Sequence, residues 1–180
     1  SKWDFQDRSD SAGAAVFNAF WRHLLQNTFD DELPKKYWPD GGSRWNDVMR
    51  HLDASSAWWD DKTTTDKVET RDDILKKSFE DGVAELEKMF GNDSSKWNWG
   101  DMHAATFRNS TLGESGVGPI ESLLNRGPYR VSGGEAVVNA TGWSIQDGYE
   151  TNWLPSMRMI VDMSNLSNSV TVHTTGESGH

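Results

Sequence analysis

The sequence predicts an α+β protein in which amphipathic helices come first and an antiparallel sheet follows. Through residues 1–91, apolar side chains recur every three or four positions, the spacing of a helix that is buried along one face. After Gly91 the pattern changes to short alternating or apolar segments separated by glycine, serine and asparagine, which is typical of strands and turns. We expect one unit over 1–180, mainly helical in 1–91 and mainly β with loops in 92–180. A chain of 180 residues can enclose its own core or form part of a larger domain.

The first predicted helix begins after Asp10 or Ser11, because either side-chain oxygen can bind the free amides of a first helical turn. It ends near Thr28. A loop rich in proline and glycine follows, and a short second helix is expected around residues 45–52. The apolar face of the first helix comprises Val16, Phe17, Phe20, Trp21, Leu24 and Leu25, and that of the second comprises Trp45, Val48, Met49 and Leu52.

The third predicted helix carries both a start signal and a stop signal. Thr70, followed three residues later by Asp73, resembles a capping box, and Gly91 supplies the residue that ends the helix. Its apolar face comprises Ile74, Leu75, Phe79, Val83, Leu86, Met89 and Phe90. The charged residues Lys76, Lys77, Glu80, Asp81, Glu85 and Glu87 are interpreted as a solvated face without chemistry.

Two short elements are expected between this helix and the end of the chain. Trp97, Asn98 and Trp99 alternate like a half-buried strand, which residues 103–107 could continue after a bulge at Gly100. Residues 119–124 could form one or two helical turns.

Three apolar segments near the end predict a meander of three strands, at about 133–143, 155–164 and 169–174. The middle segment is the longest, and we expect the rest of the chain to pack on it. Within it, Arg158 and Asp162 share one face but lie roughly 13 Å apart along the strand. Each therefore needs a partner elsewhere, with a structural ion pair as the default interpretation.

The composition indicates a core built from a few large rings. Apolar residues make up 35% of the chain and the mean hydropathy is −0.74, yet there are ten Trp and seven Phe. A chain short of aliphatic residues could also be one that leans on a partner surface. The net charge of −10, without a basic stripe, disfavours nucleic acid and anionic membrane surfaces as partners, and no apolar stretch is long enough to span a bilayer. The absence of cysteine excludes disulfides, thiolate metal sites and a cysteine nucleophile.

Few residues suggest chemistry by their spacing. Ser178 follows a predicted strand, but His180 occupies the position where a nucleophile elbow needs glycine. Ser1 could use its own α-amino group as a base, a weak signal on its own. Zinc-type spacing is absent among the histidines, which are His23, His51, His103, His173 and His180. We interpret His23 as a boundary residue of the first helix and His103, beside the Trp97–Trp99 cluster, as structural rather than catalytic.

Four strings occur in a familiar order and spacing. They are Trp97-x-Trp99-Gly100-x-x-His103, Gly133-Gly134 with Val137-Val138-Asn139-Ala140, the run Pro155-Ser156-Met157-Arg158-Met159-Ile160-Val161-Asp162, and Gly176-Glu177-Ser178-Gly179-His180. Together they resemble the C-terminal part of the β-subunit of the penicillin amidase (penicillin acylase) family. The helical first half resembles the region that precedes these strings, so the resemblance covers nearly the whole chain.

The resemblance implies an N-terminal nucleophile hydrolase, secreted or periplasmic, that cleaves acyl-amide bonds of β-lactam side chains or acyl-homoserine lactones. It also implies that this chain is a fragment of the four-layer αββα fold. Ser1 is followed by Lys2-Trp3-Asp4-Phe5, which matches an internal segment of the β-subunit, whereas the family's nucleophile opens a Ser-Asn-x-Trp stretch. We therefore reject Ser1 as the nucleophile.

No catalytic, cofactor-binding or metal-binding residue is assigned to this chain. The family's oxyanion-hole asparagine and calcium ligands are expected upstream of residue 1, so the fragment alone should be inactive. Its expected partners are the remainder of the β-subunit and the α-subunit, with self-association possible through exposed strand edges near Val137 or Val170.

Two other interpretations remain open at this point. The chain could be a Trp-rich module that binds carbohydrate or another ligand, with Trp58, Trp59, Trp97 and Trp99 as stacking platforms. Exposed ring faces would favour that module, whereas rings buried against the helices would favour the fragment. The chain could also be a purely structural piece that braces another chain. The residues that line the acyl pocket of the parent enzyme are expected to lie mostly outside this stretch.

Overall fold

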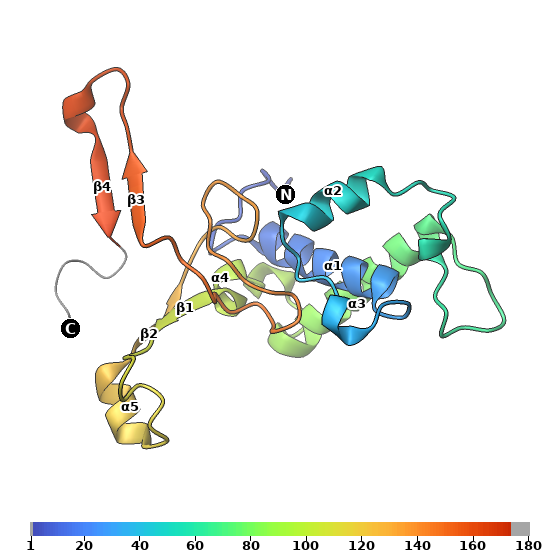
Figure 1. Cartoon of the computed structure of the whole chain (residues 1–180), viewed down its shortest axis with the longest axis horizontal. Helices are drawn as coiled ribbons and strands as arrows, with labels where there is room; N and C mark the ends of the chain where they lie inside the picture. Colours follow the sequence, from blue (N-terminus) through green and yellow to red (C-terminus); the bar gives the residue numbers. More distant parts are fainter. Residues whose placement is uncertain (1, 174–180) are drawn as a thin grey trace.

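A helical body carries two arms that project from one of its ends (Figure 1). The computed structural model describes residues 2–173. The helices are α1 (Ala12–Phe29), α2 (Ser43–His51), α3 (Arg71–Phe90), α4 (Trp99–Met102) and α5 (Gly118–Leu124). The strands are β1 (Ala104–Phe107), β2 (Arg126–Arg130), β3 (Met157–Ile160) and β4 (Val170–His173). The architecture is thus α+β, with helices first, as the sequence predicts.

The body is built on the antiparallel pair α1 and α3, which lie side by side (Figure 1). Ser11 caps α1 by accepting a hydrogen bond from the amide of Ala14 at 3.1 Å. Thr70 and Asp73 form the predicted capping box at the start of α3, and Gly91 ends that helix with a φ of 80°. A Cβ on Gly82 would lie only 3.0 Å from the backbone nitrogen of Phe20. The two helix backbones are therefore almost in contact.

Large rings form the centre of the core, as the composition predicts. Trp99 is fully buried, and the ring of His103 stacks on it with a centroid distance of 4.5 Å. The edges of Trp143 and Tyr149 close the same cluster at 5.7 and 6.1 Å. The aliphatic residues Leu25, Leu86 and Ile145 are buried in the same cluster, whereas Ile74 is buried in a second cluster with Leu24 and Trp59.

Buried and half-buried indoles also hold loops in place. Four indole N–H groups donate to backbone carbonyl oxygens at 2.7–2.9 Å. The pairs are Trp38 with Leu33, Trp59 with Asp53, Trp97 with Gly91, and Trp99 with Gly133.

The strands form two separate antiparallel pairs, β1 with β2 and β3 with β4. The predicted three-stranded meander is therefore wrong. Residues 133–143 fold irregularly over the body and make only isolated bridges. Gly133 and Ala136 have φ values of 100° and 60°, which turn the backbone away from an extended path. Burial of Trp143 against the core decides the path of this segment, whereas Val138 stays fully exposed.

The predicted strand at Trp97–Trp99 is also wrong. A 3₁₀ turn over Ser94–Lys96 leads instead into α4. The amides of Trp99 and Gly100 donate to the carbonyl oxygens of Ser11 and Ser9, at 3.2 and 2.7 Å, so they are not available to a strand partner. The continuation at 103–107 is confirmed as β1, and the helical turns at 119–124 are confirmed as α5. Strand β2 was not predicted from the sequence, because it contains Gly127 and Pro128, residue types that are depleted in strands.

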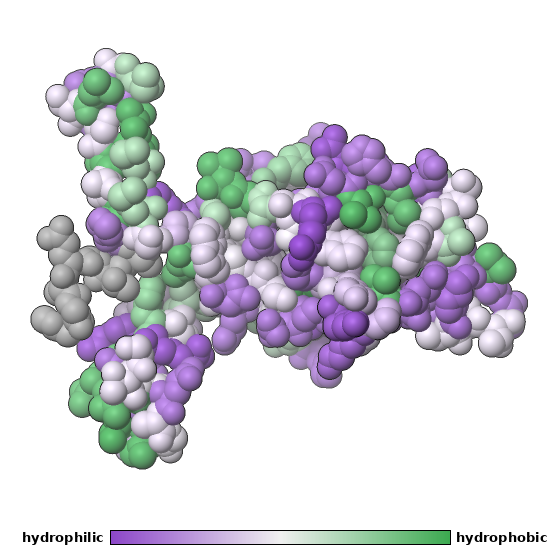
Figure 2. All heavy atoms as spheres, viewed as in Figure 1, coloured by the Kyte–Doolittle hydropathy of each residue, from purple (hydrophilic) through white to green (hydrophobic). Residues whose placement is uncertain are grey.

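The β3–β4 hairpin matches the second and third predicted strands in position, but the expectation that the chain packs on it is wrong. Every residue of both strands is exposed, and apolar side chains run along the projecting hairpin (Figure 2). The loss of the first predicted strand explains the difference, because residues 133–143 pack on the helical body instead of on the hairpin. No described helix is long and apolar enough to cross a membrane.

Candidate functional site

The side chain of Glu85 lies at the centre of the densest group of charged and polar side chains in the helical body. Its Oε1 accepts from Nη1 of Arg22 at 2.8 Å, and its Oε2 lies 3.0 Å from Nε2 of His23. The Tyr149 hydroxyl donates to Oε2 at 2.6 Å. Arg22 also donates through Nε to the carbonyl oxygen of Ile145 at 2.9 Å. The cluster thus joins α1, α3 and the loop that contains Tyr149.

Electrostatics fix the charge states in this cluster. Burial opposes the charge of Glu85, but hydrogen bonds from His23 and Tyr149 and the charge of Arg22 outweigh burial and lower the carboxyl pKa. Burial, together with the neighbouring carboxylate, raises the pKa of Tyr149 far above its usual value. Glu85 is therefore a carboxylate whose two oxygens are occupied, and Tyr149 is a neutral donor. The arrangement suits a structural joint and leaves no free base or nucleophile.

His103 forms a second polar centre in the core. Its Nδ1 lies 2.7 Å from the carbonyl oxygen of Tyr149, and its Nε2 lies 2.8 Å from the hydroxyl of Thr141. Since a carbonyl only accepts, Nδ1 carries the proton and Nε2 accepts from Thr141. Burial lowers the pKa of His103, so the ring is neutral. Both nitrogens are used and Trp99 covers one ring face, which agrees with the structural role expected for His103.

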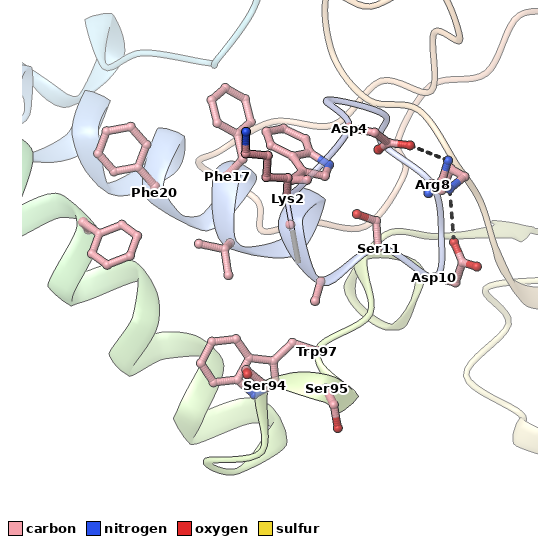
Figure 3. A pocket seen from close by; sticks show the side chains of 15 residues that line it. Lys2, Asp4, Arg8, Asp10, Ser11, Phe17, Phe20, Ser94, Ser95 and Trp97 are labelled. Atoms are coloured by element: carbon pink, nitrogen blue, oxygen red, sulfur yellow. Dashed lines mark hydrogen bonds and ion pairs between the residues drawn. The ribbon is translucent and has the colours of Figure 1, made fainter.

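A hollow of about 950 Å³ opens between the N-terminal segment, α1 and α3 (Figure 3). Phe17, Phe20 and Trp97 contribute to its apolar wall. On its rim Arg8 is paired with Asp4 at 2.7 Å and with Asp10 at 3.7 Å. Arg8 thus engages both carboxylates, and the Ser11 hydroxyl oxygen is engaged as the cap of α1. Ser95, which also lines the hollow, donates its hydroxyl to Oδ1 of Asp93 at 2.6 Å, the carboxylate that caps its own 3₁₀ turn.

The candidate nucleophiles of the sequence lie outside the described residues. Ser1, Ser178 and His180 fall in the terminal stretches that the structure does not describe. Within residues 2–173 no group of three histidines, aspartates or glutamates is arranged to hold a metal ion. His23 lies at the edge of the core, as interpreted, with Glu85 as its partner.

The tryptophan platforms expected of a binding module are not on the surface. Trp59, Trp97 and Trp99 are buried. Trp58 packs on Phe29, with ring centroids 5.4 Å apart. Rings in these positions are unavailable to a sugar, which argues against the carbohydrate-binding interpretation.

Arg158 and Asp162 have different roles in the hairpin. Asp162 holds the turn, because its Oδ1 accepts from the amide and hydroxyl of Ser164 at 2.9 and 2.6 Å and from the amide of Asn165 at 3.2 Å. The ion pair expected for Asp162 is therefore replaced by donors of its own turn. Arg158 has no ion pair with any other residue in 2–173.

Comparison with known proteins decides the family. The family model of penicillin amidase matches residues 1–180. The chain belongs to the penicillin amidase family. This confirms the resemblance.

Three relatives share the description acyl-homoserine lactone acylase QuiP. The protein of Pseudomonas aeruginosa is 27% identical over 194 residues, which cover 96% of this chain and 22% of the relative. The proteins of Pseudomonas syringae pv. syringae and Pseudomonas fluorescens are 26% and 27% identical, each over 94% of this chain and 21% of the relative. The chain thus spans about a fifth of the length of these relatives.

The Glu85 cluster was missed by sequence reasoning, and placing Glu85 on a solvated face was wrong. The signal lay in the small residues Ser78 and Gly82, four positions apart, which allow a second helix to approach closely. Glu85 stands three positions after Gly82, on the flank of that contact. A half-buried carboxylate there needs partners, and α1 supplies Arg22 and His23.

Proposed function

We propose that this chain is an internal segment of the β-subunit of an acylase that hydrolyses the amide bond of acyl-homoserine lactones or of β-lactam side chains. In that reaction water is added across the amide, so that a carboxylic acid and an amine leave. Support comes from the family match over 1–180 and from relatives named as acyl-homoserine lactone acylases.

The role proposed for the segment is to build and brace the enzyme rather than to react. The observation that carries this role is that Glu85 and His103, the best-placed acid–base groups of the described residues, are fully engaged in internal hydrogen bonds. Nucleophile, oxyanion donors and structural calcium are proposed to lie elsewhere in the parent enzyme. We further propose a secreted or periplasmic location, with the remainder of the β-subunit and the α-subunit as partners.

An assay of two proteins tests this proposal. The 180-residue chain and the longer polypeptide that contains it are incubated with acyl-homoserine lactones and with phenylacetyl amides, and the released amine is measured. The longer protein should hydrolyse one class or both, whereas the 180-residue chain should release none. The faster class identifies the substrate.

A serine variant serves as the control. Ser1→Ala in the longer polypeptide should leave hydrolysis unchanged, because Ser1 is not the proposed nucleophile. Hydrolysis by the 180-residue chain that disappears with Ser1→Ala would sink the proposal.

A further inference from the structure

The β3–β4 hairpin presents apolar side chains to solvent on both of its faces. Met159 is 64% exposed, Ile160 61% and Val172 59%, although these are residue types that folded proteins bury. The apolar surface runs along the whole arm (Figure 2). Exposed apolar residues that gather in this way mark a surface that is covered in the functional state.

The strand register shows how the apolar residues divide between the faces. Residues opposite each other in an antiparallel pair point to the same side. Arg158 opposes Val172 and Ile160 opposes Val170, so these four share one face. The second face carries the remaining opposite pairs, which are Met157 with His173 and Met159 with Thr171. A strand pair with one wet side would alternate apolar and polar residues, whereas this one has apolar residues on both sides, as strands covered on both faces do.

The hairpin's shape is fixed by its own turn. Four hydrogen bonds reach the carboxylate of Asp162, three at Oδ1 and one from the side chain of Asn168 at Oδ2. The hydroxyl of Ser169 accepts from the backbone nitrogen of Asp162 at 3.1 Å and joins the two strand ends. These bonds organise the arm without help from the helical body. Two strands alone are marginally stable in water, so the ordered arm needs a further layer.

Arg158 adds a charge requirement to this surface. It lies directly opposite Val172 and two positions before Ile160, on the same face of the hairpin. Within residues 2–173 it forms no ion pair. A guanidinium that becomes covered by apolar layers needs a carboxylate and hydrogen bonds to offset its desolvation. Whatever covers this face must bring that carboxylate.

We propose that another part of the same acylase polypeptide covers both faces of the β3–β4 hairpin and sets a carboxylate against Arg158. This inference rests on the proposed function, because the relatives have more than three quarters of their length outside the matched region. That length supplies ample chain for a covering layer. A continuous layer of the same polypeptide also removes the unpaired strand edges, which would otherwise recruit other molecules.

Single cysteines provide the test, because this chain has none of its own. Ile160→Cys probes the face that carries Arg158, and Met159→Cys probes the opposite face. Val68→Cys is the matched control, since Val68 is a loop residue with 76% exposure. Each variant is made in the 180-residue chain and in the longer polypeptide with any other cysteines removed. The rate of maleimide labelling is followed by mass spectrometry at low protein concentration.

The proposal expects all three cysteines to react at similar rates in the dilute 180-residue chain. In the longer protein Cys at 159 and 160 should react at least about tenfold more slowly than Cys at 68. Equal rates in the longer protein overturn the proposal. Protection that is lost on dilution of the longer protein also overturns it, because the cover is then a second copy.

Two variants of Arg158 test the carboxylate. Arg158→Gln in the longer protein should speed the labelling of Cys at 160 by about tenfold, because the covering carboxylate is left unpaired. Arg158→Lys, which keeps the charge, should restore most of the protection. No effect of Arg158→Gln overturns the ion pair. Amide hydrolysis is measured on the cysteine-free longer protein from which the single-cysteine variants are made. A protected hairpin in a protein without hydrolysis overturns the proposed function alone, and an unprotected hairpin in an active acylase overturns the docking alone.

Discussion

The carboxylate of Glu85 connects two helices and a distant loop through single side-chain contacts. Glu85→Gln should lower the free energy of unfolding by about 2 kcal/mol, because the guanidinium of Arg22 loses its counter-charge in a half-buried place. Urea unfolding measures the change.

Tyr149→Phe is the comparison for this cluster. It removes one hydroxyl donor and leaves the Arg22–Glu85 pair intact, so a loss of about 1 kcal/mol is expected. Equal losses for the two variants would contradict the ranking of the contacts.

His103 makes stability depend on pH. Burial lowers the pKa of the folded ring below the value of about 6.5 that applies in the unfolded chain. The unfolded state therefore takes up a proton first as the pH falls, and the folded state loses stability below pH ~6.5. We expect wild type to lose stability more steeply than His103→Gln between about pH 7 and pH 5, by at most about 1.4 kcal/mol per pH unit. Unfolding curves at both pH values that give the same loss of unfolding free energy for wild type and His103→Gln would contradict this.

Asp30 at the end of α1 has the opposite dependence. Burial and the neighbouring charge of Asp31 raise its pKa to about 6. The folded state therefore binds the proton of Asp30 more tightly than the unfolded state does. The stability that this bound proton contributes is lost as pH rises through about 6. Asp30→Asn should raise the free energy of unfolding by about 1–2 kcal/mol at pH 7.5, after allowance for partial exposure. The gain should shrink near pH 4, and thermal unfolding at both pH values checks this.

Residue roles could be predicted from the sequence only where the partner is near in the chain. Thr70 and Asp73 are three positions apart, and their capping box follows from spacing alone. Glu85 is paired with Arg22 and Tyr149, each more than 60 positions away, so its burial could not be predicted from sequence spacing. Local geometry is encoded by neighbours, whereas the charge environment is set by the tertiary fold.

Between the two long helices, Gly82 sets how closely they approach. Gly82→Ala should destabilise the protein by about 1–3 kcal/mol, because the new methyl group would press against the backbone of α1 at Ala19 and Phe20. This loss should exceed the gain of about 1 kcal/mol that alanine brings to an exposed helix interior.

Gly118 in α5 is the matched control for this substitution. A Cβ there meets nothing within 4 Å beyond its chain neighbours, so the one expected cost of Gly118→Ala is the clash of a helical Cβ with the ring of Pro119, and the loss should be smaller than at Gly82. Chemical denaturation of both variants measures the contrast. A stabilising Gly82→Ala would contradict the close approach of the helices.

Element positions were predicted well where a single face decides them. The long helices and the paired strands at β3 and β4 follow from periodicity. The stretch 133–143 reads as a strand because Val137 and Val138 are adjacent, but Trp143 has a deeper place in the core and draws the backbone onto the helices. Competition between nearby apolar residues for one buried place cannot be judged from β propensity.

At the scale of the molecule, the two arms leave sheet edges unpaired. We expect the isolated 180-residue chain to self-associate with rising concentration, because β3 and β4 present free edges and apolar faces. Sedimentation velocity over a concentration series measures this. Ile160→Lys should shift the equilibrium toward monomer, whereas Val68→Lys, at an exposed loop position, should not. A chain that stays monomeric at high concentration would contradict the expectation.

The overall α+β order and the aromatic core could be predicted from the sequence, but the placement of the sheet fragments could not. The strands form two isolated pairs instead of one meander, because residues 133–143 pack on the helical body rather than beside β3. The four-layer αββα arrangement stays a prediction, because it needs layers that this chain does not supply.

The indole contacts described for the core loops have a consequence for how the protein opens. Trp59, Trp97 and Trp99 each tie a loop carbonyl to a ring that is packed in the body. A loop cannot lift away without losing this bond or pulling the ring out of its packing. The connections of the body should therefore open together with the core, in one cooperative event, rather than by independent fraying. Proteases should accordingly cut the projecting arms long before they cut the loops of the body.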